Sequence, residues 1–265
     1  MEDFAASVRL RLLSYNIAAG ASTRQYADYV TRGWQHVLPY PGRNAVISNI
    51  ASTVRDYDIV GLQEADEGSL RSGFLNQTRF VAERGQFPYW SHQANRRVSR
   101  LACTCNALLT RLRPYRVEDH RLPGRMTGRG ALIARFGDQP EGLVVANVHL
   151  ALSRRARRSQ LDFLADQIAG NPLLTVLGDF NADLSAPEMQ RFASITGLLP
   201  AEAGRTFPSW RPARQLDHIF LSESIACNAA TVLPLSFSDH CPVAVDVNVP
   251  RHALSVSAPA QAGAA

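Results

Sequence analysis

The stretch VLGDFNADLS, residues 176–185, is an apolar run that ends in two acids and an amide. Val176 and Leu177 are typical of a buried strand, yet Asp179 and Asn181 follow almost directly. These two polar residues are two positions apart, so in an extended chain their side chains point to the same side. Because an isolated buried charge is very costly, a carboxylate at the end of such a strand must be paired or bound to a metal.

The same pattern recurs in other apolar segments of the chain. Each of five further predicted strands carries an acid, an amide or a histidine where its apolar run begins or ends. Taken singly, such a residue could equally be an exposed strand end, a satisfied core histidine or a turn cap. Because strand ends in a layered fold meet at one edge, the recurrence predicts one shared pocket. The residues are Asn16, Gln63 with Glu64, Asn147 with His149, Asp217 with His218, and Asp239 with His240.

The composition indicates a globular protein with anionic partners. The chain has 265 residues, 46% of them hydrophobic, which suffices for a sizeable core. Its formal charge is +5, and all 28 basic residues are arginine. Arginine suits bidentate contacts with phosphate or carboxylate, although a codon bias would explain the same composition. The charge favours nucleic acid, nucleotides or lipid headgroups as partners.

The cysteines and the amino terminus bear on the compartment. Four cysteines match no zinc-binding spacing, so we expect free thiols in a reducing environment. The amino-terminal stretch MEDFAASVRL lacks the basic and apolar regions of a secretion signal. No apolar run approaches the roughly 20 residues that span a bilayer. We therefore expect a cytoplasmic monomer with no stable membrane insertion.

Apolar runs and helical stripes alternate along the chain, with no internal repeat and no linker before residue 250. Several runs, such as GLVVANVHL, are continuous, as in strands that are covered on both faces. The mixture predicts a single α+β catalytic domain over residues 1–250 and a low-complexity, disordered tail over 251–265. The predicted strands are 8–18, 57–64, 104–111, 130–136, 142–150, 172–180, 215–222 and 241–249; the predicted helices are 44–57, 69–85 (N-cap Ser69), 153–170 and 186–197.

Hard oxygen ligands dominate the predicted pocket. Carboxylate and amide oxygens, with no thiolate among them, come from Asn16, Glu64, Asp179, Asn181 and Asp239. Such a set suits Mg²⁺ or Mn²⁺ rather than zinc or a redox metal. Histidines beside aspartates supply proton transfer and positive charge near neutral pH. A hard metal, a carboxylate base and histidines together indicate attack of water on a phosphoester, and no G-x-S-x-G motif for a serine nucleophile is present.

Six short motifs carry a family resemblance. In chain order they are SYNI (14–17), GLQE (61–64), NVHL (147–150), GDFN (178–181), LDHIF (216–220) and SDHCPV (238–243). Together they resemble the endonuclease/exonuclease/phosphatase superfamily, which includes pancreatic-type deoxyribonuclease, AP endonucleases, deadenylases, inositol-polyphosphate phosphatases and neutral sphingomyelinases. The resemblance implies a four-layered α/β sandwich, two packed mixed β-sheets flanked by helices, with the site at the sheet edges.

The resemblance also implies roles for the residues at the metal and at the attacking water. Glu64 would be the principal metal ligand, helped by Asn16 and Asp239. Asp179 would orient or deprotonate the water, and Asn181 would hold the phosphate. The two side chains of the opening stretch would thus point together because one prepares the nucleophile and the other holds its target.

Three further site residues follow from the same resemblance. His240, paired with Asp217, would stabilise charge on the phosphoryl group, and His149 would contact a phosphate oxygen near the leaving group. The segment CNALLTR is similar to a family stretch in which glycine stands where this chain has Cys105. Asn106 would then face the substrate, with a plain strand position as the alternative.

Two segments bear on the substrate. SRRARRSQ (153–160) places Arg154 and Arg155 in the first turn of a predicted helix. Positive charge there opposes the helix dipole by a few tenths to about 1 kcal/mol per residue, which indicates either anion recruitment or a solvated charged face. Trp210 and Arg211 lie in a proline-punctuated loop. They could stack on a base and bind phosphate, or pack beneath the loop as core.

These observations predict a Mg²⁺- or Mn²⁺-dependent phosphodiesterase that acts on nucleic acid or a nucleotide. A sphingomyelinase or phospholipase C-like enzyme, a small-molecule phosphatase and a non-catalytic binding module are the alternatives. Abasic-site repair is disfavoured, because AP endonucleases typically follow the metal-binding glutamate with Thr-Lys, whereas this chain reads QEAD.

Overall fold

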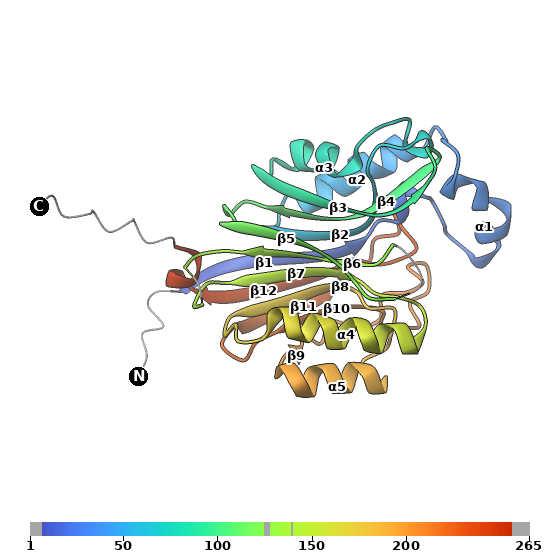
Figure 1. Cartoon of the computed structure of the whole chain (residues 1–265). Coiled ribbons are helices and arrows are strands. Elements are labelled where there is room, and N and C mark those ends of the chain that lie inside the picture. Colours follow the sequence, from blue (N-terminus) through green and yellow to red (C-terminus); the bar gives the residue numbers. More distant parts are fainter. Residues whose placement is uncertain (1–6, 125–127, 139, 256–265) are drawn as a thin grey trace, which may run out of the picture.

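The computed structural model describes residues 7–124, 128–138 and 140–255. Two six-stranded mixed sheets pack face to face, and helices cover both outer faces (Figure 1). The predicted α+β class and the four-layered α/β sandwich are therefore confirmed. The layers place strand ends from both sheets at one edge, and this arrangement positions the candidate site.

The first sheet is built around a parallel pair, β1 (Ser7–Asn16) and β2 (Ile59–Asp66). Asn16 lies opposite Gln63 in this pair, so both strands end at the same edge. The other neighbours are antiparallel. In spatial order the sheet is β11 (Ala226–Val232), β12 (Val243–Pro250), β1, β2, β4 (Ala102–Thr110) and β3 (Tyr89–Val98).

The second sheet repeats this plan around β7 (Val144–His149) and β8 (Leu174–Asp179), which are also parallel. His149 lies opposite Asp179, and Asp217 lies opposite Asp179 on the other side. All remaining pairs are antiparallel. The spatial order is β5 (Arg116–Arg121), β6 (Gly130–Arg135), β7, β8, β10 (Asp217–Leu221) and β9 (Leu199–Pro200).

Three apolar cores fill the interfaces between the layers. Leu12 and Leu177 belong to the core between the sheets, where each fully buried leucine contributes about 1.5–3 kcal/mol of transfer free energy. Ile50 and Val81 pack on the first sheet, and Leu164 packs on the second. The covering helices are α2 (Arg43–Val54) and α3 (Gln77–Gly85) on the first sheet, and α4 (Arg154–Ile168) and α5 (Pro187–Thr196) on the second.

One helix lies outside these layers. α1 (Tyr26–Thr31) projects beyond the end of the sheets (Figure 1), and the 3-10 helix η3 (Gly33–His36) follows it. Two further 3-10 turns, η2 (Ala18–Gly20) and η4 (Leu70–Ser72), follow β1 and β2. The loops after the first parallel pair therefore surround one edge of the molecule.

The helix predicted over 69–85 begins later than expected. Residues Leu70–Ser72 form η4, and Gly73 then takes a left-handed conformation that ends the turn. α3 begins at Gln77, and the side chain of Asn76 accepts a hydrogen bond from the Arg79 backbone N–H at 2.9 Å. Asn76, not Ser69, is therefore the N-cap, which is worth about 1 kcal/mol.

The strands that the sequence pattern did not predict are sheet edges. β3 and β11 form the two edges of the first sheet, and β5 and β9 form those of the second. An edge strand is not covered on both faces, so it carries no continuous apolar run. β5, with the sequence RVEDHR, is an example in which no residue is fully buried.

The remaining expectations concern the cysteines, membranes and the tail. None of the four cysteines forms a disulfide within the part of the chain that the structure describes. Among the described residues, no helix has the length and apolar character to cross a bilayer. Residues Arg251–Leu254, at the start of the predicted tail, form the 3-10 helix η5, in which Ala253 is buried. Residues 256–265 lie outside the described residues.

Candidate active site

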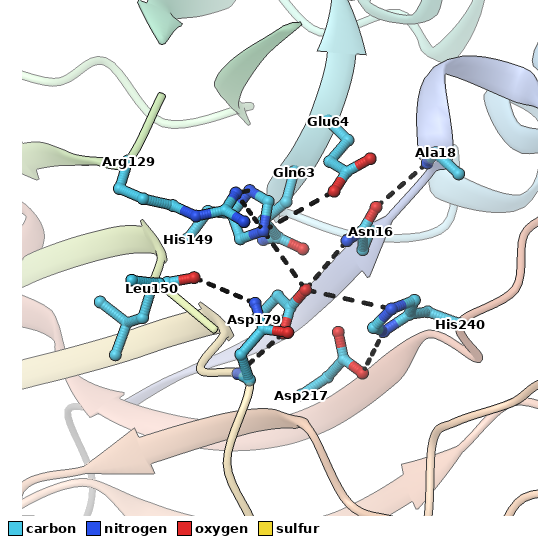
Figure 2. Close-up of polar contacts among 12 residues, drawn as sticks. Asn16, Ala18, Gln63, Glu64, Arg129, His149, Leu150, Asp179, Asp217 and His240 are labelled. Atoms are coloured by element: carbon cyan, nitrogen blue, oxygen red, sulfur yellow. Dashed lines mark hydrogen bonds and ion pairs between the residues drawn. The ribbon is translucent and has the colours of Figure 1, made fainter. Parts of the chain in front are cut away.

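Asp179 lies at the centre of a polar cluster formed by strand ends of both sheets (Figure 2). Its Oδ2 accepts a hydrogen bond from Asn16 Nδ2 at 2.9 Å, across the interface between the sheets. The Nε2 atoms of His149 and His240 lie 3.5 and 4.0 Å from the same oxygen. Its Oδ1 accepts the backbone N–H of Asn181 at 2.9 Å. Burial raises the pKa of Asp179 to about 7; the charge of His240 opposes this rise and that of Asp217 adds to it.

Gly178 sets the spacing of the strands beneath this carboxylate. Its φ is +150°, and a Cβ there would lie 2.0 Å from the carbonyl oxygen of Val148. Only glycine therefore fits at this point, where β8 approaches β7. The close approach holds His149 and Asp179 opposite each other in register.

His240 and Asp217 form a buried pair beside Asp179. His240 Nδ1 lies 2.8 Å from Asp217 Oδ2, which also accepts the Thr206 hydroxyl at 2.6 Å. Burial alone would lower the pKa of His240, but the carboxylates of Asp217 and Asp179 raise it well above the ordinary histidine value. The ring is therefore an imidazolium at neutral pH, and its Nε2 faces Asp179.

His149, in contrast, is neutral. Burial lowers its pKa well below the ordinary value, and the charge of Arg129 lowers it further. Arg129 Nη1 lies 3.0 Å from Nδ1 and 2.8 Å from Nε2 of the ring. Nε2 also lies 3.7 Å from Glu64 Oε1, so the neutral imidazole separates a guanidinium from two carboxylates.

Glu64 and Asn181 both have a left-handed backbone, with φ of 56° and 54°. Such a conformation is uncommon for residues other than glycine, and it occurs often at functional sites. Glu64 lies at a bulge, because the pairing of β2 with β4 shifts between Leu62 and Ala65. The bulge directs the half-buried Glu64 side chain towards the cluster (Figure 2). Asn181 Nδ2 donates to the Leu150 carbonyl at 3.0 Å.

The donor set fits a hard divalent cation. Glu64, Asn16 and Asp239 offer only oxygen atoms as acceptors, and Glu64 is 33% exposed at the site. One Asp239 oxygen accepts the Tyr29 hydroxyl at 2.7 Å, and the other accepts the Ser238 hydroxyl at 3.1 Å. Such outer hydrogen bonds commonly orient a carboxylate that binds a metal.

Asp179, Asp217 and His240 form another compact group, with ligand atoms within 4.8 Å of one another. Asp217 Oδ2 is already engaged by Thr206 and by His240. These hydrogen bonds fit a proton-handling group better than a metal ligand set. The Glu64 side of the cluster, with Asn16 and Asp239, thus offers a second set of oxygen atoms that could hold a cation.

The family model of the endonuclease/exonuclease/phosphatase family matches residues 13–240. The chain belongs to this family. Family members are phosphoester hydrolases that generally depend on a divalent metal, so the chain is a hydrolase of phosphoester bonds. None of the curated protein sequences matches the chain.

Solved structures of this family share the fold at low sequence identity. A family protein from Bacteroides thetaiotaomicron is 21% identical, with a TM-score of 0.68 over 91% of this chain and 98% of its own. The mannosyl-6-phosphatase Bt3783 of the same organism is 20% identical, with a TM-score of 0.65 over 90% and 99%. D. rerio TDP2, complexed with a single-strand DNA product, is 16% identical, with a TM-score of 0.65 over 91% and 99%.

Within this endonuclease/exonuclease/phosphatase fold, Trp210 lies beside the candidate cation site. Its ring contacts Tyr26 and Tyr29, with centroids 5.5 and 6.3 Å apart. Because the Tyr29 hydroxyl donates to Asp239, this aromatic wall of Trp210, Tyr26 and Tyr29 borders the candidate cation site. The exposed Arg211 follows Trp210 in the same loop.

Of the other predicted substrate residues, Asn106 lies opposite the bulge that carries Glu64, whereas Arg154 and Arg155 lie on a helix. Asn106 is fully buried in β4 and donates to the Gly130 carbonyl at 2.9 Å, next to Arg129. Arg154 and Arg155 are exposed at the start of α4. Neither arginine contacts the acids or histidines of the cluster among the described residues.

Arg129 and Tyr29 are two residues of the site that sequence analysis missed. Arg129 precedes β6, and the register places Gly130 opposite His149. A polar residue before a strand that pairs with a histidine-bearing strand is the signal that could have located it. Tyr29 lies on the projecting α1, for which the strand-end pattern gives no signal.

Proposed function

We propose that the chain is a divalent-metal-dependent phosphodiesterase, active as a monomer on nucleic acid or nucleotides. The observation that carries this proposal is the buried carboxylate of Asp179, which is held between Asn16, a neutral histidine and a charged one. This arrangement provides a base for water and a cation for the phosphoryl group within one cluster.

Asp179 prepares the nucleophile in this mechanism. A pKa of about 7 leaves a substantial carboxylate fraction at neutral pH and makes the group strong enough to accept a proton from water. The Asn16 amide fixes the orientation of Oδ2. The water oxygen then bonds to phosphorus, and the bond to the leaving oxygen breaks.

Groups on both sides of Asp179 stabilise the negative charge on the phosphoryl oxygens. His240, held by Asp217, donates from its charged ring. His149 with Arg129 contacts the phosphoryl group on the opposite side, and Asn181 holds a phosphate oxygen. A divalent ion held by Glu64, Asn16 and Asp239 would supply Lewis-acid stabilisation of the same charge.

Nucleic acid or nucleotide is the substrate class that the surroundings favour. The aromatic wall offers flat rings on which a base can stack beside the cation site. Arg211 follows it, and the arginine-only surface suits phosphate contacts. D. rerio TDP2, a protein of the same fold, has a single-strand DNA product in its structure.

Cleavage of end-labelled single- and double-stranded oligonucleotides tests the proposal. We expect cutting with Mg²⁺ or Mn²⁺, none with EDTA, and a fall of about 10²- to 10⁴-fold in Asp179→Asn. Asp56→Asn, an exposed aspartate before β2, is the matched control and should cut normally. Equal cutting by Asp179→Asn and the wild-type protein would remove the basis of the mechanism.

A lipid headgroup is the second candidate substrate, and one observation favours it. The projecting segment of α1 and η3 exposes large apolar side chains, including Tyr26, Val30 at 88%, Trp34 and the following Leu38. Exposed aromatic and aliphatic side chains of this kind suit a membrane surface. If the protein hydrolyses an aryl phosphodiester but no oligonucleotide, the lipid or small-molecule alternative replaces the nuclease proposal. Oligonucleotide binding without turnover of any phosphoester would indicate a non-catalytic module.

A further inference from the structure

A hollow lined by arginines lies between α4 and α5, outside the central cluster. It encloses about 580 Å³. Pro187 and Glu188, at the start of α5, are among the residues that line it. The guanidinium groups around it come from two helices: Arg154, Arg155 and Arg158 of α4 and Arg191 of α5.

Arg157, which does not line the hollow, already joins α4 to α5 by binding Glu188. Arg157 is nearly buried and binds Glu188 Oε1 through Nε at 3.0 Å and Nη2 at 2.7 Å. Its Nη1 donates to the carbonyl of Leu152 at 2.5 Å. Glu188 is thus neutralised from within, and the packing of α4 on α5 does not require Arg155 or Arg158.

The helix dipole of α4 disfavours the positive charge of the exposed arginines at its start. Arg154 and Arg155 stand in the first turn of α4. Arg155 and Arg158 form no ion pair within the described residues, whereas Arg154 approaches Glu188 at 3.4 Å and Arg191 pairs with Asp162 at 3.1 Å. With Arg157 included, five arginines face two acids, which leaves a net charge of +3. A bound anion would offset this concentration of charge.

The hollow lies close to the candidate active site along the chain and in the fold. α4 follows β7 and α5 follows β8, so both helices begin at the edge where those strands end. Arg154 follows His149 by five positions, which limits the distance between their Cα atoms to at most about 18 Å. A nucleic-acid strand rises about 3.4 Å per nucleotide, so about five nucleotides span this distance.

We propose that this hollow is a second phosphate-binding site, which holds the backbone of a polynucleotide strand whose scissile phosphate lies at Asp179. The inference rests on the proposed function and narrows its substrate class from nucleotides to polynucleotide chains. A strand of about five nucleotides is long enough to reach both sites, whereas a dinucleotide has one internucleotide phosphate and fills only one of them, so affinity and cleavage depend on length.

Binding of fluorescently labelled single-stranded oligonucleotides, measured by anisotropy in EDTA, tests the site without cleavage. We compare oligonucleotides of about two and about ten nucleotides, lengths on either side of the calculated span. The double variant Arg155→Gln/Arg158→Gln removes the two arginines that form no ion pair. Arg113→Gln is the matched control, because Arg113 is equally exposed but follows the end of β4 that pairs with the start of β2, away from the site.

The expected result is specific to the longer oligonucleotide. The Kd of the double variant for this oligonucleotide should be about tenfold higher than that of the wild-type protein. The slope of log K against log salt should decrease in magnitude by about 1.4, the value for two lost phosphate contacts to single-stranded nucleic acid. The short oligonucleotide should bind as before, and Arg113→Gln should change neither. An unchanged Kd for the longer strand, or equal weakening at both lengths, would overturn the proposal.

Cleavage with Mg²⁺ separates this inference from the function on which it rests. In the double variant, KM for the longer strand should rise relative to KM for the shorter one. If the wild-type protein binds the longer strand through these arginines but cuts neither oligonucleotide, the nuclease proposal fails and the phosphate-binding site stands. If it cuts both lengths and the arginine substitutions change no Kd, the nuclease proposal stands and this site is rejected.

Discussion

The two histidines on either side of Asp179 differ in charge, although both are buried at the same edge of the molecule (Figure 2). Burial, and after it the charge of the Arg129 guanidinium that contacts His149, holds the pKa of His149 well below the ordinary value. His240 contacts two carboxylates, and its pKa lies well above that value. The same side chain is thus neutral on one side of the carboxylate and cationic on the other, because its neighbours differ.

The buried site thus holds positive charge on both sides of Asp179. On one side the cation is Arg129, with the neutral His149 between it and Asp179. On the other side the cation is His240 itself, held by Asp217. Either arrangement can stabilise a phosphoryl group, but only the second places the charge on a ring that can also transfer a proton.

Asp217→Asn tests the charged side and should have the largest effect. Loss of the carboxylate removes the main cause of the raised pKa of His240, so that pKa should fall in the metal-free protein, as followed by NMR. Turnover should fall about 10²- to 10⁴-fold. The control is Asp58→Asn, at the opposite end of β2. Normal turnover in Asp217→Asn would show that the charge of His240 is irrelevant to the reaction.

Arg129→Gln tests the neutral side. The substitution removes the guanidinium that lowers the pKa of His149, so this pKa should rise while turnover falls about 10²-fold, through loss of charge stabilisation. Steady-state kinetics and an NMR titration measure the two effects. Arg121→Gln, an exposed arginine on β5, should behave like the wild-type protein. An unaltered kcat in Arg129→Gln would mean that the two sides are not equivalent in function.

Tyr29→Phe tests whether the Tyr29 hydroxyl orients Asp239, the residue of the candidate cation site that lies next to His240. The variant loses the 2.7 Å hydrogen bond to Asp239, the neighbour of His240. We expect the Mg²⁺ concentration for half-maximal activity to rise about tenfold, with little change in maximal turnover. Tyr26→Phe retains a ring against Trp210 and serves as the control. If both variants require the same Mg²⁺ concentration, the Tyr29 hydroxyl does not orient a metal ligand.

The sequence predicted the central strands and their polar ends because both follow from two-sided burial. Asn16, His149 and Asp179 end strands of the two parallel pairs, where continuous apolar runs make the boundary visible. The left-handed Glu64 could be placed at the end of its strand, but the bulge that aims it depends on pairing with β4. Pairing between distant strands leaves no local signal in one sequence.

The residues that escaped prediction act through contacts across the fold. Arg129 reaches His149 because β6 pairs with β7, and Tyr29 reaches Asp239 from a helix outside the layers. Edge strands such as β5 escaped because a polar, half-covered strand has no apolar run. The periodicity of apolar residues in a sequence indicates which positions are buried. The positions of Arg129, Tyr29 and the edge strands depend instead on contacts with residues far away in the sequence.

The position of β12 in the first sheet also has a consequence for the order in which the protein is made. β12 pairs with β1 on one side and with β11 on the other, although β1 is the first strand of the chain and β12 the last. Asp239 and His240 immediately precede β12. During synthesis the first sheet therefore stays open until residues 239–250 have left the ribosome. A nascent chain that lacks them has neither the charged His240 nor Asp239 of the candidate cation site, so under the proposed mechanism hydrolysis begins only after translation has passed β12.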